Sequence, residues 1–457
     1  MERTAECELP GGGATGSAGG SLMRTVVIGG GMAGLLVGAE LKRRGGEVVV
    51  LEANERPGGV ASTVREEGFL LEPAAGSMLL PHPHMTPILE AAGADIVPAL
   101  PEAKRRFVYE RDTLIPIPES PAIAFSPLLS WPAKFRILRE PWVKTPPDGD
   151  ESLHAYFARR FGSEAGLLMA TLMAHGVFAG DPDRLSARAA FPRIVKLEDE
   201  AGSIIRGGLS RRRQRPKGTP SASVHVPREG MGGLAKTLAD YLGDAFRPCR
   251  PVTALNREGS GWLVEGVDQL QSDGVVVALA PHSAARLLPE EVRPLLDRAV
   301  IAPVTVVGLG GRSSDMPIPA GFGVLVGPHT DLRSLGILFE SEYAPDRAPE
   351  SNSLVKVIVG GSADPEILAH SDEELVEIVR SELGRVIGAE MSPSWTNVIR
   401  HVPGIPQYNV GHTQWIGELE EALQPHEGLR LAGWGYRGIG VTTLASDAVQ
   451  IVDGLGI

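Results

Sequence analysis

Residues 24–52 read RTVVIGGGMAGLLVGAELKRRGGEVVVLE. A β-branched run leads directly into three glycines, and apolar residues at helical spacing follow. Gly29 permits a tight turn, Gly31 lets the backbone approach a pyrophosphate at the helix N-terminus, and Gly34 allows close packing of helix on strand. A second strand ends in Glu52, where a carboxylate can accept hydrogen bonds from ribose hydroxyls. Strand, glycines, helix, strand and acid in this order predict a Rossmann-like dinucleotide-binding domain.

The next segment, residues 53–59 (ANERPGG), favours FAD as the dinucleotide. The Arg56 guanidinium and the bare backbone amides of Gly58 and Gly59 can surround the same cofactor. This Arg-x-Gly-Gly extension resembles the flavin-dependent amine oxidase superfamily. The later VGLGG at 307–311 leads into Arg-Ser-Ser-Asp and not into an apolar helix. A separate NAD(P)H site is therefore not expected, and the electrons would pass to oxygen or a quinone.

Length and composition indicate an ordinary globular protein. The 457 residues predict two to four folding units, and 43% are hydrophobic and 22% charged. A net charge of −12 argues against a nucleic-acid partner. The two cysteines, Cys7 and Cys249, are too few for a disulfide framework and lack metal-ligand spacing, which fits a metal-free protein of the reducing cytoplasm. No run approaches the ~20 apolar residues of a spanning helix.

Three segments outside the fingerprint carry distinctive compositions. Residues 1–23 are rich in glycine and serine with acidic residues, which indicates a flexible tail, and Met23 directly before the first strand is a candidate start. The apolar, proline-broken tract at 122–131 suits either a core lining or a surface that dips into one leaflet. Residues 206–217 hold six basic residues and no acid, which predicts a solvated loop, with a lipid-headgroup contact as the alternative.

The remaining pattern predicts an α/β protein with a Rossmann-like FAD domain, a mostly antiparallel-sheet substrate domain and a helical subdomain. Strand patterns recur between 247 and 359, and a strong helix is expected at Asp372–Ile387. A strand at 429–433 and a helix beginning near Thr442 would return the chain to the nucleotide domain, with that helix N-terminus toward the flavin N1/O2 edge. The expected division is a tail at 1–23, an FAD-binding domain from 24–95, 223–285 and 426–457, a helical subdomain at 96–222 that could face a membrane, and a substrate-binding domain at 286–425.

Four stretches together resemble the oxygen-dependent protoporphyrinogen oxidases, including their coproporphyrinogen-oxidising branch. They are the N-terminal fingerprint with RPGG at 56–59, AKRRFVY at 103–109, GVFAGDPDRLS at 176–186, and the pair GIPQYNVGH at 404–412 and AGWGYRGIG at 432–440. The likeness runs from about residue 24 to 457.

The resemblance implies an FAD enzyme of haem biosynthesis that oxidises protoporphyrinogen IX to protoporphyrin IX. Three two-electron steps would pass electrons to the flavin, and oxygen would take them to give hydrogen peroxide. No side chain stands out as an obligatory acid or base, because the flavin carries the chemistry. The implied partners are the porphyrinogen, oxygen, and either a transient membrane surface or the next enzyme of the haem pathway. The implied setting is the cytoplasm or the inner face of the cell membrane, as monomer or homodimer.

The resemblance also assigns site residues by position. Arg106 matches a substrate-carboxylate arginine, and a guanidinium suits that role because its fork can bind a carboxylate bidentately. The other implied substrate-binding positions are Gly176, Leu325, Leu338 and Ile358. The implied cofactor-binding positions are Gly29, Gly31, Met32, Ala33, Gly34, Glu52, Arg56, Gly58, Gly59, Val252, Gly433, Ile439, Gly440 and Val441.

Other functions stay open at this point. They are oxidation of coproporphyrinogen III to coproporphyrin III, an amine oxidase in which Tyr408 and Tyr436 form an aromatic sandwich, and a non-catalytic flavin- or porphyrin-binding paralogue. Departures from the family pattern keep them open: EPAAGS at 72–77, Gly-Trp at 433–434, Val-Thr-Thr-Leu at 441–444, and His401.

Overall fold

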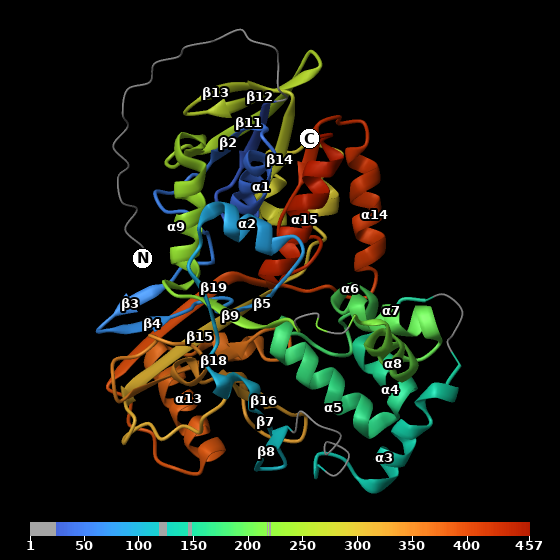
Figure 1. The fold of residues 1–457 in the computed structure, drawn as a ribbon, viewed down its shortest axis with the longest axis vertical. Helices are drawn as coiled ribbons and strands as arrows, with labels where there is room; N and C mark the ends of the chain where they lie inside the picture. Colours follow the sequence, from blue (N-terminus) through green and yellow to red (C-terminus); the bar gives the residue numbers. More distant parts are fainter. Residues whose placement is uncertain (1–23, 118–125, 145–148, 217, 219–220) are drawn as a thin grey trace.

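The computed structural model describes residues 24–117, 126–144, 149–216, 218 and 221–457, so the tail expected at 1–23 and the first four residues of the apolar tract at 122–131 lie outside the described residues. Figure 1 shows three neighbouring parts. A nucleotide-binding domain occupies the upper half, a large sheet lies at the lower left, and a group of helices lies at the lower right. This arrangement confirms the fold class expected from the sequence.

A five-stranded parallel sheet forms the centre of the nucleotide-binding domain, in the order β10-β2-β1-β14-β20. Its strands are β10 (Phe246–Arg247), β2 (Glu47–Leu51), β1 (Arg24–Ile28), β14 (Gly274–Val277) and β20 (Leu429–Leu431). Val27 packs toward one face and Val26 toward the other, and both are fully buried. Burial on both faces explains why these strands read as continuous β-branched runs.

Helices and a small sheet cover the two faces of this parallel sheet. One face packs on α1 (Met32–Arg43), α2 (Met85–Ala92), α9 (Gly230–Leu242) and α15 (Val441–Gly454). The other face packs on α14 (His412–Leu423) and on the sheet of β11 (Val252–Glu258), β12 (Gly261–Gly266) and β13 (Gln269–Ser272). Three distant chain segments thus meet around one parallel sheet.

The second large sheet has seven strands in the order β19-β15-β18-β17-β16-β7-β8, all antiparallel except the β16–β7 pair. Its strands are β19 (Trp395–Pro406), β15 (Ile301–Arg312), β18 (Asn352–Gly360), β17 (Ser334–Leu338), β16 (Gly323–Val326), β7 (Arg106–Glu110) and β8 (Thr113–Ile117). The predicted helix α13 (Asp372–Ile387) covers one face and starts with a capping box between Ser371 and Glu374.

The helical subdomain consists of short helices around one apolar core. Its elements are α3 (Trp131–Leu138), η3 (Glu140–Trp142), α4 (Leu153–Phe161), α5 (Ser163–Met173), the π-helical turn η4 (Ala174–Phe178), α6 (Ala187–Ala190), α7 (Pro192–Ala201) and α8 (Ile204–Gln214). The smaller elements elsewhere are β3 (Val64–Glu66), β4 (Phe69–Leu71), β5 (Met78–Leu80), β6 (Ile96–Pro98), η1 (Pro101–Lys104), β9 (Ser223–Pro227), η5 (Gly243–Ala245), α10 (Pro281–Ala284), α11 (Arg293–Leu296), α12 (Glu340–Tyr343) and η6 (Pro365–Ala369). Among the described residues, none of the helices combines the length and apolarity needed to cross a membrane.

Two expectations from the sequence differ from the structure. The basic segment at 206–217 is not a loop, because most of it belongs to α8. The buried Glu140 carboxylate accepts hydrogen bonds from the amides of Ile204 and Ile205. The Ser203 hydroxyl accepts one from the Arg206 amide, so two side chains cap the helix N-terminus. The hairpin at 106–117 lies in the seven-stranded sheet and not with the helices, because its pairing with distant β16 leaves no local sequence signal.

A buried ionic cluster joins the nucleotide-binding domain to the seven-stranded sheet. It consists of Glu72, Glu340, Tyr343, Arg347 and Lys356, each at most 2% exposed. Arg347 donates to Glu72 at 3.2 Å, and the Lys356 ammonium lies 2.8 Å from the Glu340 carboxylate. Lys356 also donates to the carbonyls of Glu72 and Ala74 at 3.1 Å each. Breaking one partner of such a pair strands a buried charge, which costs about 3–5 kcal/mol.

Glu72 should make the stability of the protein depend on pH. Burial raises the pKa of Glu72 from 4.5 to about 7, although the Arg347 guanidinium and the Met231 amide act in the opposite direction. The folded state therefore holds one more proton than the unfolded state between these values, and the free energy of unfolding falls as pH rises through this window, by about 3 kcal/mol. Denaturant unfolding from pH 4.5 to 7.5 measures this slope.

Glu72→Gln should flatten that pH dependence, because the amide does not titrate, whereas Glu67→Gln on the exposed β3–β4 turn should leave it as in the wild type. The same slope in wild type and Glu72→Gln would contradict the assignment of the proton to Glu72.

Candidate cofactor and substrate site

The first βα turn divides its glycines into two kinds. Gly29 has φ +109°, and a Cβ there would lie 2.7 Å from the Ala278 carbonyl oxygen. A Cβ on Gly34 would overlap the Gly29 carbonyl. These two glycines are therefore required by the turn and by the packing of α1 on the strand, as the fingerprint predicts.

Gly31 and Gly59 instead border open space. A Cβ on Gly31 would have its nearest neighbour 4.0 Å away, at the Gly58 carbonyl, and a Cβ on Gly59 would lie 3.4 Å from the Gly31 Cα. The Gly58 amide donates to the Gly30 carbonyl at 2.8 Å, so the two glycine-rich turns lie side by side. We call Gly31, Gly58 and Gly59 with the start of α1 the glycine cradle.

The N-terminus of α1 has the features of an anion-binding site. Its N-cap, Gly31, provides no side-chain acceptor, and its first turn, including Met32 and Ala33, contains no acidic residue. The unpaired amides of this twelve-residue helix can therefore donate to phosphate oxygens. The Arg56 side chain is exposed beside the cradle and makes no ion pair within the described part of the chain.

Glu52 lies at the end of β2, 7% exposed, over the glycine turn. Its carboxylate accepts from the Gly30 amide at 2.6 Å and from the Asn54 amide at 2.8 Å, so it is held in one orientation. The Arg250 amide donates to the Glu52 carbonyl at 2.7 Å, which brings Val252 at the start of β11 to the same edge. The Glu52 carboxylate therefore lies beside the cradle, and its binding of ribose hydroxyls stays a prediction.

The C-terminal segment approaches the same edge of the sheet. Gly433 has φ +131°, and a Cβ added to it would lie 3.9 Å from the Leu279 carbonyl oxygen. The Leu279 side chain also lies next to Gly29, where an added Cβ would be 2.9 Å from its Cδ2. Gly440 is the N-cap of α15, which starts at Val441 and has no acidic residue in its first turn. Helix α15 packs beside α1. Ile439 packs partly on the core of the helical subdomain. Two uncapped helix N-termini thus border the site.

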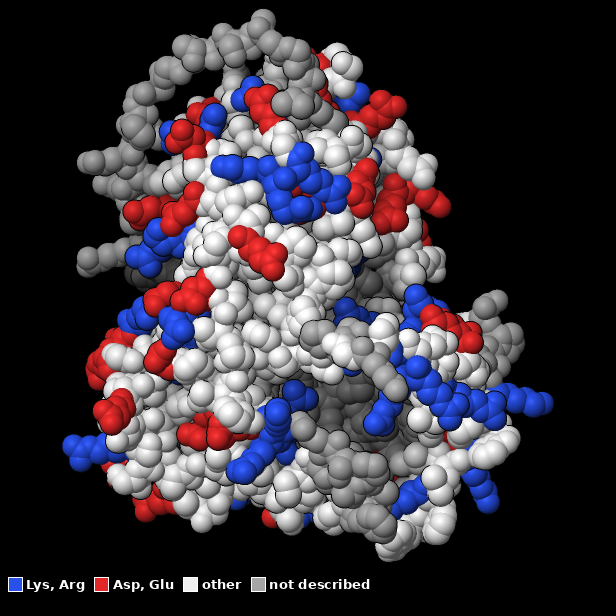
Figure 2. All heavy atoms as spheres, viewed as in Figure 1, with Lys and Arg blue, Asp and Glu red and all other residues white. Residues whose placement is uncertain are grey.

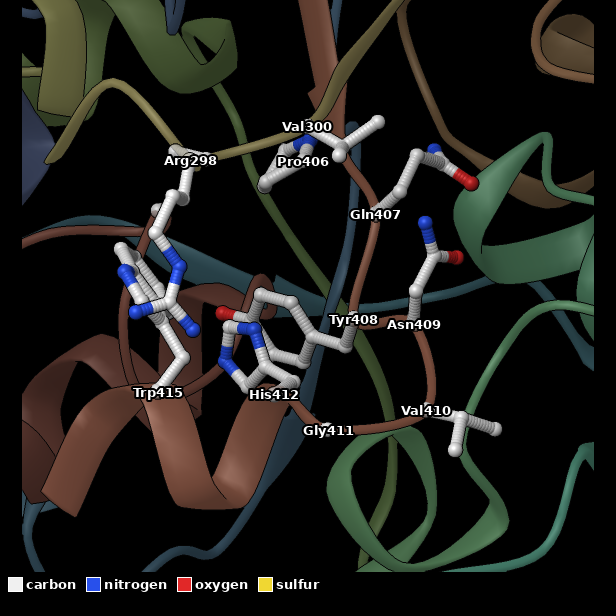
Figure 3. A pocket seen from close by; sticks show the side chains of 12 residues that line it. Arg298, Val300, Pro406, Gln407, Tyr408, Asn409, Val410, Gly411, His412 and Trp415 are labelled. Carbon is white, nitrogen blue, oxygen red and sulfur yellow. The ribbon is translucent and has the colours of Figure 1, made fainter. Parts of the chain in front are cut away.

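Tyr408 and His412 support this C-terminal segment from behind. The Tyr408 hydroxyl donates to the Trp434 carbonyl and accepts from the Gly438 amide, both at 2.7 Å. The two rings stack with centroids 4.0 Å apart at the wall of a cavity of about 180 Å³ (Figure 3). The His412 ring donates to the Tyr436 carbonyl at 2.8 Å, and burial lowers the His412 pKa, so the ring is neutral near pH 7.

Tyr408 and Tyr436 do not form an open aromatic pair. They are 2% and 1% exposed, and backbone groups occupy both hydroxyls. The sequence showed two tyrosines in glycine-rich motifs, but it gave no sign that one of them braces the loop that carries the other.

A half-buried apolar surface lies on the face of the seven-stranded sheet opposite α13. Leu325, Leu338 and Ile358 are half-buried positions in strands that are otherwise buried apart from the first residue of β18. Leu325 and Ile358 both pair with Gly336, and Leu338 lies one pleat along, so all three side chains point to this face. Their neighbours in sequence point the other way, into the core against α13.

Gly176 lies opposite this surface, on the π-helical turn η4. It is exposed, and a Cβ there would lie 2.8 Å from the Leu325 methyl Cδ2. Figure 2 shows the molecular surface hollowed between the sheet and the helical subdomain, with Lys and Arg side chains at the rim. We call the space between η4 and the apolar surface of the sheet the slot.

Arg106 stands at the edge of the slot. It is the first residue of β7 and pairs with Gly323, which pairs in turn with Leu338, so the three share one row of the sheet. Its guanidinium lies 5.4 Å from the centre of the Phe322 ring and is exposed. Because it makes no ion pair within the described residues, it can bind an anionic group of a ligand.

Lys356 and Glu340 lie next to the slot, and neither is among the site residues predicted from the sequence. Lys356 pairs with Leu338 on the slot side of the sheet, but carbonyls of the 72–77 loop cover its ammonium. His401 donates to the Pro73 carbonyl at 2.9 Å and holds the same loop. A lysine inside the apolar run LVKVIV (354–359) was the available signal, because a buried charge requires a partner.

The cradle and the two helix N-termini define a dinucleotide-binding protein. The model of the family described as flavin containing amine oxidoreductase matches residues 32–441, and the chain belongs to this family. The cofactor is therefore FAD, as the sequence predicted, and the open glycine cradle fits it.

Individual relatives are similar along most of the chain. Protoporphyrinogen oxidase from chloroplasts of Oryza sativa subsp. japonica is 30% identical and covers 93% of this chain and 86% of its own length. Coproporphyrinogen III oxidase of Bacillus subtilis is 28% identical, over 91% of this chain and 94% of its own. A crystal structure from Exiguobacterium sp. 255-15, provisionally named protoporphyrinogen oxidase, superposes with a TM-score of 0.79 at 24% identity, over 96% of this chain and all of its own.

Gly31→Ala should weaken FAD binding without harming the fold. Gly31 has φ −67° and free space for a methyl group, so the polypeptide tolerates alanine, whereas the methyl group would occupy the position of the pyrophosphate. We expect at least about a tenfold rise in the Kd for FAD, measured by flavin fluorescence titration of the apoprotein. Gly417→Ala on α14, where a Cβ would also meet open space, is the matched control, and unchanged FAD affinity in Gly31→Ala would contradict the cradle.

Proposed function

We propose that the chain is an FAD-dependent, oxygen-using porphyrinogen oxidase that converts protoporphyrinogen IX to protoporphyrin IX in three two-electron steps. The observation that supports this most is the half-buried apolar surface of Leu325, Leu338 and Ile358, which has at its edge the Arg106 guanidinium, a group without an ion pair among the described residues. A porphyrinogen is a broad apolar macrocycle with propionate groups. The apolar surface suits the macrocycle, and the Arg106 guanidinium suits a propionate.

The residues of the slot would hold and orient the substrate. Leu325 and Ile358 would contact the macrocycle from the sheet, Gly176 would border it where η4 comes close to Leu325, and Arg106 would bind a propionate. Bound FAD supplies the two-electron acceptor, and oxygen regenerates it with release of hydrogen peroxide. The polypeptide contributes position and exclusion of water.

Coproporphyrinogen III is the second candidate substrate, because relatives of similar identity bear the name coproporphyrinogen III oxidase. An amine substrate is less well supported, since Tyr408 and Tyr436 are buried behind the C-terminal loop. We also propose that the enzyme is cytoplasmic and attached peripherally to a membrane. The exposed aromatic and basic residues of the helical subdomain support this attachment.

Aerobic turnover by the FAD-loaded protein tests the reaction. Visible porphyrin absorption should grow from colourless protoporphyrinogen IX, with about three hydrogen peroxide molecules per porphyrin. A flavin-loaded protein that produces neither from protoporphyrinogen IX nor from coproporphyrinogen III would refute the proposal.

Arg106→Ala should raise KM for the porphyrinogen by roughly 10–100-fold with a smaller effect on kcat, because a charge-assisted hydrogen bond contributes about 1.5–3 kcal/mol to binding. Arg105→Ala removes an equally exposed arginine whose side chain points to the other face of the chain. It should leave KM within about twofold. Equal effects of the two variants would argue against the carboxylate role of Arg106.

Gly176→Ala should lower kcat/KM by narrowing the slot, because the new Cβ would lie 2.8 Å from the Leu325 methyl. Leu325→Val in the same chain shortens the opposing side chain and should restore part of the activity. Steady-state kinetics of the two single variants and the double variant measure this coupling. If the two substitutions lower kcat/KM additively, Gly176 and Leu325 do not contact the same bound substrate.

A further inference from the structure

The C-terminal loop, residues 432–440, borders the glycine cradle but has little structure of its own. It connects β20 to α15 and forms neither helix nor strand. Four of its nine residues are glycines, and two of these, Gly433 and Gly438, have φ +131° and +129°. Backbone that is rich in glycine has many accessible conformations, so the position of this loop must be fixed by contacts of its polar groups.

Arg437 ties the C-terminal loop to its surroundings, in addition to the hydrogen bonds from Tyr408 and His412. Its guanidinium donates to the Asp447 carboxylate on α15 at 2.5 Å and to the Leu431 carbonyl at the end of β20. A third and longer contact reaches the Glu420 carboxylate on α14 at 3.3 Å. One planar group thus joins three elements around the loop, which a guanidinium can do because its donors form a rigid fork.

Asp447 anchors this ion pair in the interior. It lies in the second turn of α15 and is 4% exposed, and the Gly433 amide also donates to its carboxylate. The carboxylate therefore holds the loop both near its start, at Gly433, and at Arg437. Helix α15 is itself fixed by its packing beside α1. A buried carboxylate keeps its partners because an unpaired charge in the interior is costly.

A cavity of about 490 Å³ borders the ion pair. Residues of α14, β20 and α15 line it, and they include Arg437, Asp447 and Arg430. Arg430 covers the same edge strand, because it donates to the Leu429 and Gly454 carbonyls at 2.9 Å each, and both of these contacts lie outside the C-terminal loop. Where the cavity borders the loop, the hydrogen bonds of Arg437 and not packed side chains support it.

We propose that Arg437 and Asp447 are positioning residues for the flavin, and that their ion pair, by fixing the C-terminal loop and the adjoining N-terminus of α15, sets the reduction potential of bound FAD. The loop ends at Gly440, the N-cap of α15, whose first turn has no acidic residue. The positive end of a helix dipole stabilises the negative charge that a flavin gains on reduction. A loop released from Asp447 would hold this end less closely, and the oxidised flavin would be favoured.

The reduction potential of the FAD-loaded full-length protein, measured by equilibration with a reference dye and without porphyrinogen, tests this role. Arg437→Gln removes the guanidinium, and Asp447→Asn removes the charge of its partner at nearly the same volume. Each should lower the preference of the protein for reduced over oxidised FAD by about tenfold, which corresponds to a potential about 30 mV more negative.

Arg430→Gln is the matched control, because Arg430 lines the same cavity and covers the same edge strand. It should leave the flavin potential as in the wild type, even where it lowers the melting temperature. Arg437→Lys keeps the charge and should recover part of the shift seen in Arg437→Gln. In Arg437→Gln/Asp447→Asn the shift should equal that of one single variant, since both substitutions remove one interaction. FAD absorbance and the melting temperature verify that each variant is loaded and folded.

Two results would overturn the proposal. They are a wild-type potential in FAD-loaded Arg437→Gln and Asp447→Asn, and an equal shift in Arg430→Gln, which would assign the effect to general destabilisation. If the neutral variants do not fold, Arg437→Lys is compared with Arg430→Lys, and equal potentials of these two would also overturn it. The proposal concerns the flavin site alone, so a failure of porphyrinogen turnover with the expected shift in potential would refute the proposed function and leave the positioning role supported.

Discussion

The buried ionic cluster fixes how the two halves of the molecule meet. Lys356 on the seven-stranded sheet binds the carbonyls of Glu72 and Ala74, and Arg347 binds the Glu72 carboxylate. Glu72 also accepts from the Met231 amide at the start of α9, which packs in the nucleotide-binding domain. One carboxylate thus links the glycine cradle side to the slot side. Charges buried this deeply hold their geometry because a displaced partner would leave an uncompensated charge.

The alternation of side chains along the strands determines which residues of the sheet face the slot. On β16, β17 and β18 every second side chain packs against α13, and the intervening Leu325, Leu338 and Ile358 face the slot. A shift of one residue in register would exchange these two faces. The row that carries Leu338 also carries Arg106. The same pairing therefore places an apolar wall and a cation at one opening.

The sequence predicted the parts that depend on local chemistry. The glycine fingerprint and the helical pattern at Asp372–Ile387 are signals carried by neighbouring residues, and the structure contains both elements. The seven-stranded sheet needs pairings across more than 200 residues, so the hairpin that begins at Arg106 was placed with the helices instead. Lys356 was overlooked because its partners come from distant segments. Helix α8 was misread as a loop, since its cap involves Glu140, 64 residues before the helix start.

We propose that the glycine cradle binds the flavin and that the slot binds a porphyrinogen. Anaerobic mixing of the FAD-loaded protein with protoporphyrinogen IX, followed by visible absorption of the flavin, measures that directly. The account predicts that the oxidised flavin spectrum bleaches and that porphyrin appears with it, and coproporphyrinogen III in a parallel mixture reports the preference. A flavin that stays oxidised with both porphyrinogens, in protein that retains its FAD, would contradict the account.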